Sequence, residues 1–233
     1  SSTSRGLGDV YKRQVNVSPE GFATKIYDSD ENEIQTLSSA GANRTYVTID
    51  QIPKDLQHAF IAIEDERFYE HNGIDMRGIL RAASITLSSG EMSQGASTIT
   101  QQLLKNNVFN AFNESTIEKI KRKVQEQYLA IKLETVMSKD SILENYLNTI
   151  NLGNGYYGVQ AAARGYFNKD VSELSISECA VIASITKSPT GLNPIRHADR
   201  NKDRQSQVLL NMKEQEYISQ EEYDEAVADD VYA

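Results

Sequence analysis

The stretch AFIAIEDERFYEHNGID, residues 59–75, decides how the helical part of the chain begins. Leu56, Phe60 and Ile63 recur at helical spacing and predict a helix with one apolar face. Glu64 follows Phe60 by four residues, about 40° away around the helix, at the edge of that face. Partial burial there raises the pKa of a carboxyl group, which suits Glu64 to act as a general base. A solvated acidic helix end has the same pattern, so both interpretations stay open at this point.

A second segment, SQGASTITQQLLKN at 93–106, places glycine and small polar residues directly before a helical pattern. Thr98 and Gln101 have the spacing of a capping box, so a helix is predicted to begin there. The free backbone N–H groups of such a helix N-terminus attract phosphate. Gln102 and Lys105 lie one turn apart on the same face and could reach a polar ligand. An ordinary well-capped helix is the alternative.

A third segment, EKIKRKVQEQYLAIKLE at 118–134, gathers positive charge around one carboxylate. On a helix, the side chains of Lys119, Arg122, Lys123 and Glu126 fall within a sector of about 100°. A solvated, salt-bridged surface helix is the alternative. The three segments together suit transfer from a diphosphate donor, because the cations would stabilise the leaving diphosphate and a carboxylate would deprotonate the attacking hydroxyl.

The composition excludes several classes of protein. The chain has 233 residues, 39% of them hydrophobic, enough for one domain or one domain with a small appendage. Its net charge of −9 argues against nucleic acid as a partner. The single cysteine, Cys179, can form no internal disulfide and is expected to be a buried, inert thiol. The three histidines lack metal-site spacing, and no apolar run is long enough to span a membrane.

The pattern along the chain predicts a mainly α fold with a small β appendage at its N-terminal side. Short β-like runs around the turn-rich DSDEN predict a β-hairpin at 22–37. TYVTI, at 45–49, predicts one more short strand. From Pro53 onward, nearly all of the sequence predicts helices.

The expected helices are marked by apolar spacing and by caps. Helices are predicted at 115–137, 176–187 and 200–216. The first of these carries apolar residues at Ile117, Ile120, Val124, Ile131 and Val136. The expected capping residues are Ser138, Ser175 with Glu178, and Ser219 with Glu222.

Five segments of the chain together resemble a known family. EDERFYEHNG, QGASTITQQLLKN, RKVQEQYLAIKLE, KDSILENYLN and GVQAAARGYF occur in this order and at close to the expected distances. They resemble the five motifs of the peptidoglycan glycosyltransferases, the transglycosylase domain of class A bifunctional penicillin-binding proteins. The resemblance covers about residues 45–215, and five ordered motifs are far more specific than one. It favours the functional interpretation of each segment described above.

The resemblance implies a lysozyme-like, two-lobed, mainly helical domain beside the membrane. It implies polymerisation of lipid II into β-1,4-linked glycan with inversion, and release of undecaprenyl diphosphate. Glu64 matches the family's general base, which would activate the 4-hydroxyl of the incoming lipid II. Asp65 and Glu66 are then structural or solvent-facing, and Glu126 matches a second carboxylate that orients groups around the diphosphate.

Further residues match family positions that contact the substrate. These predicted substrate-binding residues are Arg67, Ser97, Thr98, Gln102, Lys105, Arg122 and Lys123. Those in the second and third motifs match positions that line the cleft or hold the diphosphate, and Arg67 matches a polar contact near the base. His71 is expected to support its loop. No metal-ligand cluster is visible, so no cofactor is assigned, although a divalent cation, Mg²⁺ or Mn²⁺, could accompany the diphosphate.

The sequence departs from the family at one position. Members often carry Arg four residues before the RK pair, where this chain has Glu118. Because the charge is reversed, Glu118 is not assigned to the site. Either Lys119 or Lys121 substitutes for the arginine, or the contact to the donor is weaker.

The implied partners are lipid II, the growing glycan chain, membrane lipid and inhibitors of the moenomycin type. The implied location is the extracytoplasmic face of the bacterial plasma membrane, with the membrane anchor absent from this chain. An exposed apolar patch is expected at 106–117, where Val108, Phe109 and Phe112 occur among polar residues.

The chain is expected to contain four segments. Residues 1–14 have no periodicity and are expected to be a non-native leader, and 15–50 form the hairpin and linker segment. The glycosyltransferase domain is expected at 51–216, followed at 217–233 by the start of a linker toward an absent transpeptidase domain.

Two other functions compete with this interpretation. A lysozyme-like enzyme that cleaves glycan requires no diphosphate site, so the cationic helix face argues against it. A non-catalytic cell-wall-binding module is the second, and the intact Glu64 and Glu126 argue against it.

Overall fold

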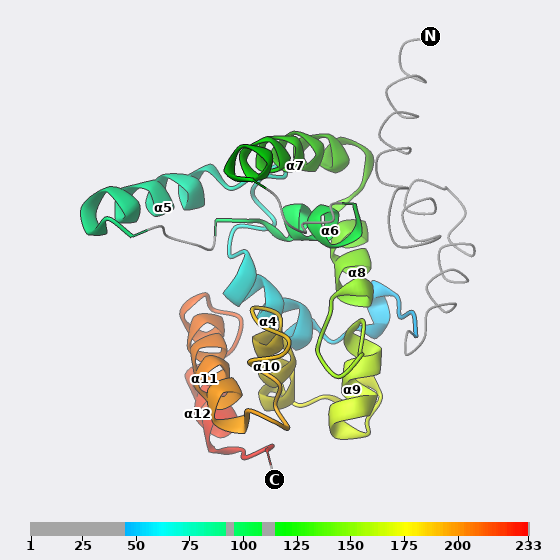
Figure 1. Ribbon diagram of the computed structural model, residues 1–233. Helices are drawn as coiled ribbons and strands as arrows, with labels where there is room; N and C mark the ends of the chain where they lie inside the picture. Colours follow the sequence, from blue (N-terminus) through cyan, green and yellow to red (C-terminus); the bar gives the residue numbers. More distant parts are fainter. Residues whose placement is uncertain (1–44, 92–95, 109–114, 233) are drawn as a thin grey trace. The chain divides into compact units, whose positions relative to one another are not determined.

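The computed structural model describes residues 45–91, 96–108 and 115–232, and these are mainly helical, as predicted (Figure 1). The elements are η1 (Ile49–Gln51), α4 (Lys54–Glu64), α5 (Met76–Ser89), α6 (Ile99–Asn107), α7 (Thr116–Val136), α8 (Lys139–Thr149), α9 (Val159–Phe167), η2 (Val171–Glu173), α10 (Ile176–Ile185), α11 (Ala198–Glu214) and α12 (Gln220–Ala228). The chain divides into two compact units. Unit 1 contains the described residues of Arg67–Ile142, and unit 2 contains those of Ser38–Glu66 and Leu143–Ala233.

The core of unit 2 is built by α4, α10 and α11, which pack against one another (Figure 1). Helix α10 is buried along almost its whole length, because ISECAVIASI is apolar around most of its circumference. Leu56 and Phe60 of α4, predicted as an apolar face, are fully buried. Cys179 is buried as expected, and this burial raises the pKa of its thiol well above the usual value, as in an inert thiol.

Small residues let α9 pack closely within unit 2. Ala162 and Ala163 are fully buried in it. A Cβ atom on Gly165 would lie only 2.1 Å from the ring of Tyr156, so a larger residue would displace that ring. The small residues of GVQAAARGYF therefore let this helix pack closely against its neighbours.

The prediction of a strand at 45–49 is wrong, because residues 45–48 form no regular element and η1 follows them directly. The Val47 N–H donates to Asn148 Oδ1 (2.9 Å), and the Asn148 amide donates back to the Val47 carbonyl (2.8 Å). The Ile49 N–H donates to Glu144 Oε1 (2.6 Å). Side chains of α8 thus satisfy the backbone groups that a partner strand would otherwise satisfy.

In unit 1, α6 packs against α7, and the buried face of α7 differs from the apolar stripe predicted. The apolar residues singled out in the sequence are exposed: Ile117, Ile120, Val124, Ile131 and Val136. The buried residues of the helix are Glu126, Leu129, Ala130 and Leu133. Two faces of α7 carry apolar residues, so spacing alone could not show which one packs. Helix α5 has no buried residue.

Capping boxes form at the N-termini of α6, α10 and α12, as predicted. They join Thr98 with Gln101, Ser175 with Glu178, and Ser219 with Glu222. At the start of α8, the Ser138 hydroxyl accepts a hydrogen bond from the Ser141 N–H (3.1 Å). These predictions hold because a cap depends only on residues within one turn.

Some predictions concern parts of the chain outside the described residues. The hairpin at 22–37 lies there, and so do Phe109 and Phe112 of the expected apolar patch, whereas Val108 is described and half-buried. Among the described residues, no helix combines the length and the apolar character needed to cross a membrane.

Candidate functional site

Glu64 is the last residue of α4, in unit 2, and its side chain is 14% exposed. The next residue, Asp65, is buried, and Glu66 is exposed. Arg204 of α11 places its Nη2 atom 3.8 Å from Glu64 Oε1. Burial disfavours a charged carboxylate and a nearby guanidinium favours it, so the two effects oppose each other at this residue.

Tertiary contacts hold the end of α4 in place. Asn211 of α11 and Gln215, the C-cap of that helix, both donate to the Ala62 carbonyl, at 3.2 and 3.0 Å. Tyr146 of α8 is fully buried nearby. Burial, and then the negative charge of Glu64, raise the pKa of its phenol well above the usual value. Tyr146 therefore stays protonated, and the carboxylate lies on a rigid helix end.

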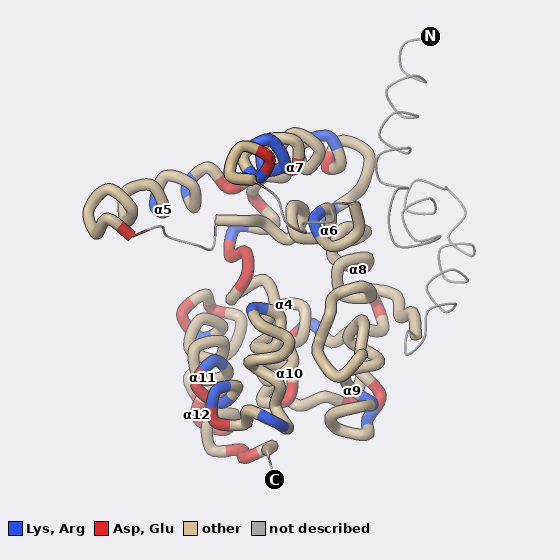
Figure 2. The backbone as a smooth tube through the Cα atoms, viewed as in Figure 1, with Lys and Arg blue, Asp and Glu red and all other residues tan. Residues whose placement is uncertain are grey.

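Glu126 lies in unit 1, on the buried face of α7, with its side chain 1% exposed. Lys123 Nζ is 3.0 Å from Oε1, and Arg122 Nη1 is 3.9 Å from Oε2. Gln101 of α6 donates to Oε1 from 3.4 Å. The predicted clustering of cations around one carboxylate is therefore found for Arg122 and Lys123, while Lys119 is exposed. Figure 2 shows both basic and acidic residues on this helix.

Ser97 and Thr98 both lie at the N-terminus of α6 but have different contacts. Ser97 Oγ accepts a hydrogen bond from Lys123 Nζ (2.6 Å), and both side chains are partly exposed. Thr98 is buried; its hydroxyl donates to the Gly73 carbonyl (2.7 Å) and accepts from the Gln101 N–H (3.1 Å). The Thr98 hydroxyl thus holds the fold together, whereas Ser97 and Lys123 present polar atoms to solvent.

Arg67, Gln102 and Lys105 are the other residues predicted to bind substrate. Arg67 makes a two-pronged ion pair with Asp75, with Nη2 2.7 Å from Oδ2 and Nε 2.9 Å from Oδ1. The hydrogen bond from Arg67 holds the pKa of Asp75, the N-cap of α5, below its usual value. Arg67 therefore stabilises its loop against α5, and its substrate contact stays a prediction. Gln102 is half-buried, and Lys105 is exposed on the last turn of α6.

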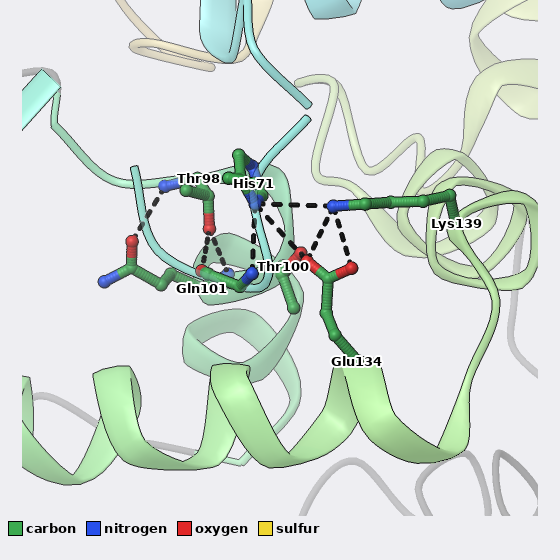
Figure 3. A network of polar contacts seen from close by, with 7 residues as sticks. His71, Thr98, Thr100, Gln101, Glu134 and Lys139 are labelled. Carbon is green, nitrogen blue, oxygen red and sulfur yellow. Dashed lines mark hydrogen bonds and ion pairs between the residues drawn. The ribbon is translucent and has the colours of Figure 1, made fainter. Parts of the chain in front are cut away.

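A second polar network in unit 1 joins His71, Glu134 and Lys139 (Figure 3). Lys139 Nζ lies 2.7 Å from Glu134 Oε1, and His71 Nδ1 lies 3.4 Å from Oε2. Burial raises the pKa of Glu134, but the polar groups around its carboxylate, Lys139 among them, outweigh burial, so the net pKa is lowered. Thr100 donates to the same carboxylate (3.1 Å), and His71 Nδ1 accepts the Gly73 N–H (3.0 Å). The network ties the His71 loop to α6, α7 and the first turn of α8.

Glu118, the departure from the family pattern, has a structural explanation. Its carboxylate accepts the Ser115 N–H (3.1 Å), and the Ser115 hydroxyl accepts the Glu118 N–H (3.2 Å). The two residues form the capping box of α7, for which glutamate is a favoured residue.

The part of the chain that the structure describes has no group of three or more His, Cys, Asp or Glu side chains placed to hold a metal ion. A divalent cation at the diphosphate would therefore find no cluster of protein ligands among these residues.

Two residues of the candidate site were missed by the sequence analysis. Arg204 lies beside Glu64. The sequence carries one signal for it: Arg204 directly precedes Gln205, which lies on the face of α11 that is buried. Gln101, assigned there to the cap alone, also reaches Glu126. Unit 2 thus supplies a partly buried carboxylate, Glu64. Unit 1 supplies cations beside a helix N-terminus, and such a group of cations suits an anionic ligand.

Residues 30–213 match the transglycosylase family. The chain is 47% identical over 201 residues to penicillin-binding protein 1A of Escherichia coli, which covers 86% of this chain and 23% of that protein. It is 45% identical over 200 residues to penicillin-binding protein 1F of Bacillus subtilis, which covers 86% of this chain and 27% of that protein. A crystal structure of penicillin-binding protein 1A from Haemophilus influenzae has a TM-score of 0.46 and 26% identity, over 81% of this chain and 18% of that one. The chain spans about a quarter of the curated relatives it matches.

Proposed function

Because the chain belongs to the transglycosylase family, as a peptidoglycan glycosyltransferase domain of the class A penicillin-binding proteins, we propose that it polymerises lipid II. The product would be a β-1,4-linked glycan formed with inversion, and undecaprenyl diphosphate would be the leaving group. The observation that carries this proposal is the cluster of Lys123, Arg122 and Ser97 around the buried Glu126, because glycan cleavage would need no such anion-binding group.

Glu64 is the proposed general base. Inversion requires one displacement, in which the acceptor 4-hydroxyl attacks the anomeric carbon of the donor. The new C–O bond forms as the bond from that carbon to the diphosphate oxygen breaks, and the electron pair leaves with the diphosphate. The hydroxyl proton passes to the Glu64 carboxylate. Arg204, 3.8 Å away, would keep this carboxylate charged and oriented before it accepts the proton.

The cations of unit 1 are proposed to hold the donor diphosphate. Lys123 is partly exposed, so its ammonium can donate to a phosphate oxygen beyond its contacts with Ser97 and Glu126. Lys105 and Arg122 would add positive charge, and the N-terminus of α6 would add backbone N–H groups. Glu126 would act by positioning Lys123 and Arg122. Phosphoglycolipid inhibitors of the moenomycin type would compete here.

The lipid tail of the substrate would bring the domain to the extracytoplasmic face of the bacterial plasma membrane. The exposed apolar side chains of α5 and α7 in unit 1 support such contact, because surfaces of this kind bind the apolar interface of a bilayer.

Incubation of the purified chain with lipid II in detergent tests the proposal. We expect polymeric glycan and undecaprenyl diphosphate, separated by electrophoresis and chromatography. Finished glycan incubated alone should stay intact; its cleavage would instead support a lysozyme-like hydrolase. Binding of lipid II without turnover would support a non-catalytic cell-wall-binding module.

A further inference from the structure

A polar pocket in unit 2 has no part in the reaction proposed above. It has a volume of about 320 Å³ and lies between the loop after α8 and the loop that joins α10 to α11. The side chains that line it are chiefly Asn151, Asn154, Tyr157, Thr190, Asn193 and Arg196. Its volume is at the small end of ligand pockets, which suits one sugar unit with a short substituent.

The pocket is preformed by the backbone of its two loops. Gly153, Asn154 and Gly155 all have left-handed backbone, with φ of +75°, +55° and +74°. A Cβ atom on Gly153 would lie 2.7 Å from the Pro189 carbonyl oxygen, so the loops meet there with no room for a side chain. Asn193, which is 3% exposed, donates to Asn154 Oδ1 (3.1 Å) and accepts two backbone N–H groups of its own loop. A pocket built this way need not be ordered by its ligand.

The charge of the pocket is positive, although the chain as a whole is acidic. Arg196 is the charged residue of the lining, and none of the described residues that line the pocket is acidic. The net charge of the whole chain is −9, so the positive charge of this pocket is opposite in sign to that of the chain. A guanidinium presents a planar set of donors that matches a carboxylate.

The neutral groups of the pocket suit a sugar. Asn151, Asn154 and Thr190 supply amide and hydroxyl groups, which both donate and accept hydrogen bonds. Tyr157 is 36% exposed, and an aromatic ring at a surface offers an apolar face with a polar edge. The combination fits an N-acylated sugar that also carries a carboxylate.

We propose that this pocket binds the peptide-bearing N-acetylmuramyl unit of the glycan, with Arg196 contacting a carboxylate of its peptide. The inference rests on the proposed function, because it identifies a part of the same substrate. A diphosphate fits this pocket poorly, since one guanidinium would have to balance more than one negative charge.

Titration of the ¹⁵N-labelled chain, followed by NMR, tests the inference. The probe is an N-acetylmuramyl dipeptide with a free carboxylate, and the neutral comparison is N-acetylglucosamine. We expect the amide signals of Gly153 and Gly155 to shift with the muramyl peptide, and the neutral sugar to bind at least about tenfold more weakly. Equal affinity for the two probes, or no shift in these loops, would overturn the inference.

Two variants probe the pocket, and a third is the control. Asn154→Asp keeps the acceptor for Asn193 and tolerates left-handed backbone, but it adds a negative charge. It should weaken binding of the muramyl peptide by about tenfold, as should Arg196→Ala. Arg200→Ala, an exposed arginine on α11, should bind as the unaltered chain does. Unchanged binding in both pocket variants would overturn the proposal.

The polymerisation assay separates this inference from the proposed function. A chain that polymerises lipid II, but shows no binding at these loops, overturns the pocket alone. A chain that binds the muramyl peptide here but leaves lipid II unreacted keeps the pocket and overturns the proposed function.

Discussion

Lys123 and Glu126, one turn apart on α7, form an ion pair in which Nζ lies 3.0 Å from Oε1. The pair is asymmetric, because the Glu126 side chain is 1% exposed and that of Lys123 is 44% exposed. The same Nζ atom donates to Ser97 Oγ (2.6 Å) before the first turn of α6. Lys123 therefore links a buried carboxylate to a helix N-terminus and still presents positive charge to solvent, where a diphosphate would meet it.

The first prediction concerns this charge. Lys123→Ala and Lys105→Ala should each weaken binding of a phosphoglycolipid inhibitor of the moenomycin type by about 1.5–3 kcal/mol, if the contact is desolvated. Replacement by Arg should rescue binding only in part, because a guanidinium has a different shape. Fluorescence anisotropy measures the affinity, with Lys202→Ala on α11 as an exposed control. Unaltered affinity in both alanine variants would place the anion site elsewhere.

The second prediction concerns the general base. Glu64→Gln keeps the size of the side chain but cannot take the proton, so polymer formation should slow by about 10²–10⁴-fold. Glu66→Gln, the exposed neighbour, should react at nearly the original rate. Glu126→Gln should also be slow and should change inhibitor binding more than Glu64→Gln does. The measurement is glycan formed from lipid II over time; a fast Glu64→Gln variant would exclude Glu64 as the base.

The third prediction uses the pH dependence of Glu134. Because the polar groups around it, Lys139 among them, lower its pKa below the usual 4.5, the Glu134 carboxylate stabilises the fold above that pH. The stabilisation is lost as pH falls through the lowered pKa. Glu134→Gln should therefore reduce the free energy of unfolding by about 1.5–3 kcal/mol at pH 7, and by much less near pH 3.

Urea unfolding at both pH values measures this difference. Glu70→Gln, an exposed carboxylate in the same loop as His71, is the control and should change stability little at either pH. If Glu134→Gln lowered the free energy of unfolding equally at both pH values, the charge of Glu134 would not be the source of its stabilising effect.

The fourth prediction concerns the glycine in the His71 loop. Gly73 has φ of +108°, and a Cβ atom there would lie 2.5 Å from the Ala130 carbonyl oxygen of α7. Gly73→Ala should therefore lower the free energy of unfolding by more than the backbone strain alone would, which is about 1–3 kcal/mol. Gly90 has φ of +72° with nothing within 4 Å of a Cβ atom, so Gly90→Ala should carry the strain alone. Denaturant unfolding compares the two, and equal costs would contradict the predicted clash.

The fifth prediction concerns the exposed apolar face of α7. Ile120 and Val124 are 60% and 59% exposed, so changing both to Ser should alter the free energy of unfolding by only about 0.5 kcal/mol each. Their loss should weaken binding of the chain to liposomes, measured by co-sedimentation. Val227→Ser on α12, a similarly exposed residue, should leave liposome binding unchanged. Equal liposome binding by all variants would remove α7 from the membrane contact.

The sequence by itself determined the mainly α class, the caps and the motifs that resemble the family. Capping boxes such as that of Thr98 and Gln101 form within one turn, so neighbouring residues suffice to specify them. The position of Glu64 at the edge of a buried helix face follows from helical spacing in the same way.

Only the tertiary structure decided which partners these elements meet. Arg204 reaches Glu64 from another helix. The side chain of Asn148 hydrogen-bonds the N–H and carbonyl groups of Val47, which a neighbouring strand would otherwise have bonded. On α7, Glu126 is buried and Ile120 is exposed, the reverse of what the apolar spacing predicted. The burial of Glu126 depends on contacts from α6, where Gln101 donates to its carboxylate. Each of these outcomes rests on residues far apart in the chain, and the local periodicity of a sequence carries no information about such contacts.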